Sequence, residues 1–142
     1  DLTERQFRNI FKKASNTKGD TSQILIELLE RRLDATVYRM KFVPTIFAAR
    51  QLVNHGHVKV NGKRVNIPSY SVSDGDEISI KDKSKEINLV VESIISQERE
   101  IPEYLEVDVK ELKGRFLRAP LIHDVPYPVT MEPNLVIEYY SR

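Results

Sequence analysis

The spacing of apolar residues predicts two helices at the start of the chain. Between residues 3 and 14 apolar side chains recur about every 3.6 residues, as on one buried helical stripe, and Thr3 with Gln6 forms a capping box. The same period predicts a second helix over residues 21–32. This helix would end in Arg31 and Arg32, because the negative end of a helix dipole favours cations.

A break and a third helix are predicted next. Asp34 can cap a new helix, so we expect an interruption there even though the apolar period continues. Pro44 then stops the chain, because the residue before a proline is pushed out of helical geometry. Thr45 caps a short helix that runs to about Asn54 and ends at Gly56.

Beyond Gly56 the period changes from that of a helix to that of a strand, and a β-hairpin is predicted over residues 58–65. Its Asn61-Gly62 pair supplies the two positive φ angles of a type I′ turn. In the resulting register Lys59 lies opposite Arg64, and two facing cations repel each other unless an anion lies between them. The alternative is that both long side chains extend into water.

Further strands are predicted in the second half of the chain. Asp74-Gly75-Asp76 is a turn before an alternating strand over residues 77–80. Residues 105–108 and 114–117 are also expected to be strands, whereas residues 88–100 are ambiguous and are expected to be helical. Prolines from residue 120 onward mark an extended, irregular path to the C-terminus.

The composition is that of a folded protein that stays in solution. With 142 residues, 40% of them hydrophobic, the chain has room for one domain or for a small domain with a helical annex. No apolar run approaches the roughly 20 residues of a membrane helix. The absence of cysteine excludes disulfides and thiolate sites. Asp1 is not an initiator residue, so we expect that the original start of the chain was removed.

The net charge of +1 conceals an uneven distribution. Residues 1–66 contain 13 Lys and Arg against 6 Asp and Glu, a net charge of +7. Residues 67–142 contain 9 Lys and Arg against 15 Asp and Glu, a net charge of −6. A basic half on a nearly neutral chain favours a localised contact with a polyanion such as a nucleic acid.

The third predicted helix carries the best candidates for that contact. On a helical wheel, Arg50, Gln51 and Asn54 share with Phe47 the side opposite the apolar stripe. An aromatic ring in this position can stack on a base while its neighbours bind phosphates and base edges. The alternative is that Phe47 packs inside the protein. Together with the helix N-terminus at Thr45 and the basic hairpin, this face is suited to grip a phosphate backbone.

No motif points to catalysis. His55 and His57 could be metal ligands, but His123 is the remaining histidine of a chain without cysteine, and a structural turn is the simpler interpretation. Asp74-Gly75-Asp76 is ordinary turn chemistry. A Gly-rich phosphate loop, a nucleophile elbow and a kinase-type lysine motif are all missing from the sequence. We therefore predict no catalytic residue, no metal and no cofactor.

A long run of residues resembles a known RNA-binding family. The module is named after the fourth protein of the small ribosomal subunit, and we call it the S-four module. The matching positions are Arg32-Leu33-Asp34, residues 49–63, residues 65–70 and Gly75-Asp76. The flanking residues 4–8, 104–108 and 132–142 resemble the bacterial ribosomal proteins of the S-four family in particular. The resemblance therefore covers nearly the whole chain.

The resemblance implies an α+β fold in two parts. Both chain ends, residues 1–31 and 125–142, would form a helical domain that includes a short helix near the C-terminus. Residues 32–124 would form the inserted S-four module, with helices packed on a small, mainly antiparallel sheet and a C-terminal β extension. Members of the family are non-catalytic components of the small ribosomal subunit. They bind a multi-helix junction in the 5′ domain of small-subunit ribosomal RNA and nucleate assembly beside neighbouring ribosomal proteins.

The resemblance also implies a cytoplasmic, ribosomal protein that is monomeric when free and makes no membrane contact. The residues that it assigns to RNA binding, with Phe47 added from the helical wheel, are Arg5, Arg8, Lys12, Lys13, Arg31, Arg32, Arg39, Lys41, Thr45, Phe47, Arg50, Gln51, Asn54, Lys59, Lys63 and Arg64. The chain departs from the family at Ile46, where members often have arginine, and at Phe47, where they have a small residue. It also lacks the family's N-terminal extension.

Two alternatives use the same module. A fragment of an RNA-modifying enzyme of the pseudouridine synthase type would need a catalytic domain, and no span remains for one after the module. A translational repressor that binds messenger RNA would use the same surface as the ribosomal protein.

Overall fold

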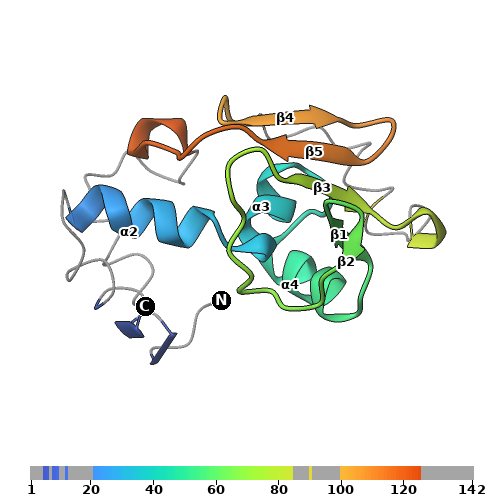
Figure 1. Cartoon of the computed structure of the whole chain (residues 1–142), viewed down its shortest axis with the longest axis horizontal. Helices are drawn as coiled ribbons and strands as arrows, with labels where there is room; N and C mark the ends of the chain where they lie inside the picture. The colour runs from blue at the N-terminus through green and yellow to red at the C-terminus, as the bar shows by residue number, and fades with distance from the viewer. Residues whose placement is uncertain are drawn as a thin grey trace. The chain divides into compact units, whose positions relative to one another are not determined.

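The computed structural model describes residues 5, 6, 8, 9, 12, 21–84, 90 and 100–125 (Figure 1). The chain divides into a terminal unit, Asp1–Glu30 with Pro120–Arg142, and a central unit, Arg31–Ala119. The predicted domain boundaries after residues 31 and 124 lie close to these limits, and the existence of two separate domains stays a prediction. No helix in the described ranges has the length and the apolar content needed to cross a membrane.

The described part of the terminal unit is built on helix α2 (Thr21–Glu30). Leu25 and Leu29 are buried at helical spacing, as predicted. The side-chain Nε2 of Gln23 donates a hydrogen bond of 2.7 Å to the carbonyl oxygen of Pro120, just before the 3-10 turn η2 (Ile122–Asp124). This hydrogen bond therefore connects the N-terminal and C-terminal segments of the unit at Gln23 and Pro120. In the predicted first helix, the described residues are all helical, and the expected C-terminal helix lies outside the described residues.

Helix α2 ends at Glu30, so the prediction that Arg31 and Arg32 form its last turn is wrong. The chain is extended at Arg32, with φ −61° and ψ 140°, and this residue forms an isolated antiparallel bridge with Ser71. The N–H of Val72 also donates to the carbonyl oxygen of Arg31 at 2.8 Å. Pairing with a segment about forty residues away thus replaces the last helical turn.

Helix α3 (Leu33–Arg39) begins directly after this extended residue. Asp34 was expected to cap a new helix, but the N-cap position is Arg32, two residues earlier, and Asp34 lies in the first turn of α3. The N–H groups of Leu33 and Asp34 donate to the main-chain carbonyls of Tyr70 and Pro68, at 2.8 and 3.1 Å. Loop carbonyl oxygens therefore accept hydrogen bonds from the free N–H groups at the start of α3. In other helices a capping side chain accepts hydrogen bonds from such groups.

Helices α3 and α4 (Ile46–Asn54) end in the same way, at a left-handed residue. Gly56, with φ 81°, ends α4 as predicted, and the N–H of His57 donates to the carbonyl oxygen of Leu52 at 3.2 Å. At the end of α3 the left-handed residue is Lys41, with φ 68°, whose N–H donates to the carbonyl oxygen of Tyr38 at 3.0 Å. The predicted stop before Pro44 is therefore a few residues too late, because Lys41 and not a glycine takes the left-handed position.

The central unit contains a five-stranded antiparallel sheet in the order β2-β1-β3-β5-β4, which confirms the α+β fold. The strands are β1 (Val58–Val60), β2 (Lys63–Arg64), β3 (Glu77–Ile80), β4 (Leu105–Asp108) and β5 (Lys113–Phe116). The predicted hairpin register is confirmed, with Lys59 opposite Arg64. Asn61 and Gly62 have φ values of 51° and 80°, as the type I′ turn requires. β5 begins one residue earlier than expected, and most of the segment 88–100 lies outside the described residues.

One face of this sheet carries the core of the central unit. Alternate residues of a strand share a face, and the buried side chains of β1 and β3 are Val58, Val60, Ile78 and Ile80. Helices α3 and α4 pack against each other beside the sheet (Figure 1). At the other end of the sheet, the ring of Phe116 meets that of Tyr104 edge to face, with centroids 5.7 Å apart.

Gly114 in β5 is fixed by its neighbours in this core. A Cβ atom at Gly114 would lie 2.5 Å from Sδ of the buried Met40 and 3.1 Å from the carbonyl oxygen of Glu106. We expect Gly114→Ala to lower the free energy of unfolding by about 1–3 kcal/mol, the usual cost of overpacking. Denaturant unfolding of the full chain measures this change. The cost should shrink in a Met40→Ala background, and an equal cost in both backgrounds would contradict the explanation.

Candidate nucleic-acid interface

Helix α4 turns one face to the core and the other to solvent. Oγ1 of Thr45 accepts the N–H of Ala48 at 3.0 Å, which confirms the predicted cap. The apolar stripe of α4 is buried. On the opposite face Gln51 and Asn54 are exposed, and Phe47 is 65% exposed. The alternative that Phe47 packs inside the protein is therefore wrong, and the exposed ring stands among polar side chains.

Arg50, on the same helix, is held by a buried carboxylate. Arg32 donates Nε–H to Oδ1 of Asp34 and Nη2–H to Oδ2, both at 3.1 Å. Nε of Arg50 lies 3.5 Å from the same Oδ2, and the side chain of Asp34 is 2% exposed. Arg32 is thus buried in an internal pair, and its RNA contact stays a prediction. Arg50 keeps 28% of its side chain exposed, so it is oriented by Asp34 and still reaches the surface.

Arg31 is also held by contacts within the central unit, and its side chain is 19% exposed. Its guanidinium donates to the carbonyl oxygen of Val72 at 2.9 Å and to Oδ1 of Asp74 at 2.8 Å. It also lies 4.9 Å from the centroid of the Phe116 ring, a cation–π distance. These contacts, and not a helix dipole, account for the position of Arg31. Its assignment to RNA binding stays a prediction.

The β1–β2 hairpin places cations beside the end of α4. Lys63 and Arg64 are exposed, and Lys59 is half-buried opposite Arg64. A Cβ atom at Gly56 would lie 2.7 Å from Nε of Arg64 and 2.8 Å from its Cζ. The guanidinium therefore lies over the glycine that ends α4. Arg64 nevertheless stays exposed, so the alternative in which both facing cations extend into water stays a prediction.

His57 lies within this group of cations. Its Nδ1 is 2.6 Å from Oγ of Ser84, a buried residue of the 3-10 turn η1 (Asp82–Ser84). Burial lowers the pKa of His57 from 6.5, and the positive charges of His55, Lys81 and Arg64 lower it further. The sequence analysis left His55 and His57 out of the interface because their positions suggested only a turn, and it did not single out Lys81. No local signal shows that they meet.

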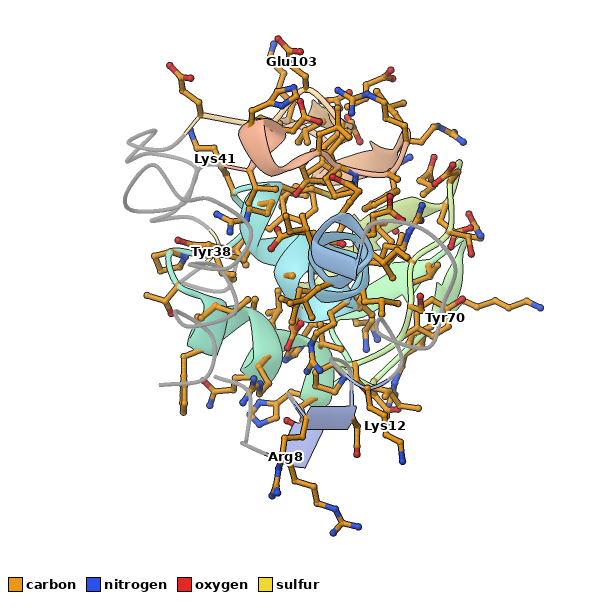
Figure 2. The ribbon with its side chains drawn as sticks, turned by 90° about the vertical axis from the view of Figure 1, so that its left-hand side faces the viewer. Arg8, Lys12, Tyr38, Lys41, Tyr70 and Glu103 are labelled. Carbon is orange, nitrogen blue, oxygen red and sulfur yellow. The ribbon has the colours of Figure 1, made fainter. Side chains whose placement is uncertain are left out.

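The remaining predicted contacts lie at the end of α3 and in the terminal unit. The guanidinium of Arg39 lies 5.2 Å from the centroid of the Tyr38 ring, and Figure 2 shows Tyr38 and Lys41 on the same side of the protein. In the terminal unit Arg5, Arg8 and Lys12 are exposed. Figure 2 shows the last two extending away from the ribbon. Lys13 lies outside the described residues.

The residues considered for catalysis have structural roles. Gly75, with φ 86°, lies in the predicted turn, where Oδ2 of Asp76 accepts the N–H of Ser73 at 2.9 Å. Asp74 is paired with Arg31. Within the described ranges, no three His, Asp or Glu side chains are grouped so that they could hold a metal ion.

Comparison with known proteins connects this geometry to a family. The family model of the S4 domain, which is the S-four module, matches residues 31–78, the segment that contains α3, α4 and the hairpin. A small ribosomal subunit protein uS4 from Ruegeria sp. is 62% identical over all 142 residues, which cover 69% of the length of that relative. The chain belongs to the uS4 family. The proteins of the same name from Gluconacetobacter diazotrophicus and Paracoccus denitrificans are 61% and 60% identical, each over the whole chain and 69% of the relative.

Membership in the uS4 family decides between the interpretations of the sequence. The relatives are named as proteins of the small ribosomal subunit, which agrees with the expected family. Membership in the uS4 family does not agree with the alternative interpretation, a fragment of an RNA-modifying enzyme. The exposed face of α4 and the basic hairpin both lie within the residues that match the S4 domain.

Proposed function

We propose that this chain is a structural, non-catalytic component of the small ribosomal subunit that binds small-subunit ribosomal RNA. The proposed contact surface is the outer face of α4 together with the β1–β2 hairpin. We further propose that it binds at a multi-helix junction in the 5′ domain early in assembly, beside neighbouring ribosomal proteins. The observation that carries this proposal is the exposure of Phe47 among Arg50, Gln51 and Asn54.

The chemistry of this surface suits folded RNA. Arginine and lysine side chains contact phosphates and supply affinity, whereas side chains cannot easily read the deep, narrow major groove of an A-form helix. An unstacked base at a junction is accessible to an aromatic ring, and Phe47 offers one. The cations of the hairpin continue the same surface past Gly56. Junction RNA is therefore a better match than a regular duplex.

Co-sedimentation is the direct test of the assignment to the ribosome. The full chain, expressed in bacterial cells, is expected to travel with the small subunit through a sucrose gradient. Recovery with messenger RNA at the top of the gradient, and none with the subunit, would favour the repressor interpretation. Association with neither would refute the proposal.

Phe47→Ala tests the surface itself. Loss of one stacking contact is expected to weaken binding of the full chain to a junction RNA by about 1–3 kcal/mol, or about 5- to 150-fold. Leu117→Ala is the matched control, because Leu117 is an exposed apolar residue of the central unit that lies outside α4 and the hairpin. Filter binding at fixed salt measures both variants. Equal affinities of the two variants would place the RNA elsewhere.

A further inference from the structure

Four basic residues lie close together where α4 ends and β1 begins, and three of them were not expected to take part in binding. The rings of His55 and His57 have centroids 6.3 Å apart. Arg64 reaches this point from β2, since its guanidinium lies over Gly56. Lys81 directly follows β3, and its main-chain N–H donates to the carbonyl oxygen of His57 at 2.9 Å, which places the backbone of Lys81 beside His57. We call His55, His57, Arg64 and Lys81 the His57 cluster.

The ring of His57 is fixed within this cluster. Its Nδ1 lies 2.6 Å from Oγ of Ser84, and the N–H of Ser84 donates to the carbonyl oxygen of Lys81 at 2.8 Å. The turn η1 therefore anchors the imidazole and the backbone of Lys81 together. When the ring is protonated, both of its nitrogens donate, and Nδ1 can donate to the Ser84 hydroxyl. Protonation is thus compatible with the observed hydrogen bond.

Among the described residues, the charges that shift the pKa of His57 are all positive. His55 follows α4, Arg64 lies on β2 and Lys81 follows β3, and each of these groups lowers the pKa of His57, after burial as the largest cause. Turn η1 also contains Asp82 and Lys83, both exposed, and neither contributes to this shift. The cluster therefore brings cations close together, and a bound anion would reduce the repulsion between them.

We propose that the His57 cluster is a phosphate subsite of the RNA interface, and that filling it makes His57 take up one proton from solvent. This inference rests on the proposed function and adds a regulation by pH to it. A guanidinium, an ammonium and an imidazolium together offer the N–H donors that phosphate oxygens accept in charge-assisted hydrogen bonds. A bound phosphate also brings negative charge among the cations, so the protonated ring becomes favoured when the site is filled.

The sign of the pH dependence follows from the proton that His57 takes up when phosphate binds. In the free protein the pKa of His57 is below 6.5, and the bound phosphate raises it. Binding with proton uptake is strongest at pH values below both pKa values and weakens as the pH rises through them. The gain is about tenfold in affinity for each unit by which phosphate raises the pKa. The affinity for RNA should therefore fall as the pH rises from acidic values, below 6.5, to mildly basic values.

The first test compares the affinity of the full chain for a junction RNA across this pH range at constant salt. The wild-type chain should lose affinity as the pH rises, and His57→Gln should lose most of this dependence. His123→Gln is the matched control, because His123 is an exposed histidine of the terminal unit. An unchanged pH dependence in His57→Gln, in a protein that still binds RNA, would overturn the inference and leave the proposed function intact.

The second test does not depend on RNA binding. The imidazole resonances of His57 are followed by NMR during pH titrations of the full chain, with and without inorganic phosphate. Phosphate is expected to raise the pKa of His57 and to do so less in Lys81→Gln. A pKa that phosphate leaves unchanged, or a stronger response to an acidic peptide than to phosphate or RNA, would refute the phosphate subsite. A response to phosphate in a protein that fails to bind junction RNA would refute the proposed function and retain the subsite.

Discussion

Asp34→Ala is expected to lower the free energy of unfolding by about 3–5 kcal/mol, the usual cost of removing one partner from a buried ion pair. The carboxylate accepts two hydrogen bonds from Arg32 and one from the N–H of Ala35 at 2.7 Å, and Arg50 lies beside it. Without it, the guanidinium of Arg32, whose side chain is 10% exposed, would remain buried and uncompensated. Denaturant unfolding of the full chain measures the loss.

Two further variants separate this explanation from a general effect of removing a carboxylate. Glu103→Ala removes an exposed carboxylate of the central unit and is expected to change the free energy of unfolding by less than about 0.5 kcal/mol. Asp34→Asn keeps an oxygen that can accept a hydrogen bond and should lose less than Asp34→Ala. If Asp34→Ala were as mild as Glu103→Ala, the buried ion pair would not stabilise the fold as we describe.

Binding to RNA is expected to weaken by about 10⁴- to 10⁵-fold between 50 and 200 mM salt, because each neutralised phosphate releases counterions. If about ten phosphates are contacted, the logarithm of the affinity falls against the logarithm of the salt concentration with a slope of about −7 to −9. Filter binding of the full chain to a junction RNA at several salt concentrations, at fixed pH, measures this slope.

Removal of a single cation of the hairpin should change the slope of this salt dependence. Lys63→Gln and Arg64→Gln are each expected to make it shallower by about one. Lys110→Gln is the control, because Lys110 is an exposed cation in the turn between β4 and β5, away from the hairpin. A nearly flat salt response of the wild-type chain would contradict a phosphate interface, and an equal effect of Lys110→Gln would move that interface to another face.

Much of the fold could be read from the sequence because several signals are local. Asn61-Gly62 specifies a tight turn, and that turn fixes which residues of β1 and β2 face each other. Thr45 and Gly56 mark the two ends of α4 through hydrogen bonds that span only a few residues. The same helix was predicted with an exposed polar face, and the exposure of Gln51 and Asn54 agrees with that prediction.

The roles of Arg31, Arg32 and His57 could not be read in this way. A helix dipole seemed sufficient to explain two arginines after an apolar stripe, but their partners are Val72, Asp74 and Asp34. From the sequence, His57 was interpreted as part of a structural turn. In the structure, the pairing of three strands brings Lys81 and Arg64 near it. Contacts between residues that are distant in the chain leave no periodic trace in the sequence.

The sequence by itself determined the helix α4, the hairpin and its register, the sign of the charge on this half of the chain, and the family. These properties depend on side chains a few residues apart, on residue counts or on the order of residues. The tertiary structure alone decided that Arg32 is buried against Asp34, that Phe47 is exposed, and that His57 lies among cations. Each of these outcomes depends on which distant segments the packed core brings together, and on how much water that packing excludes.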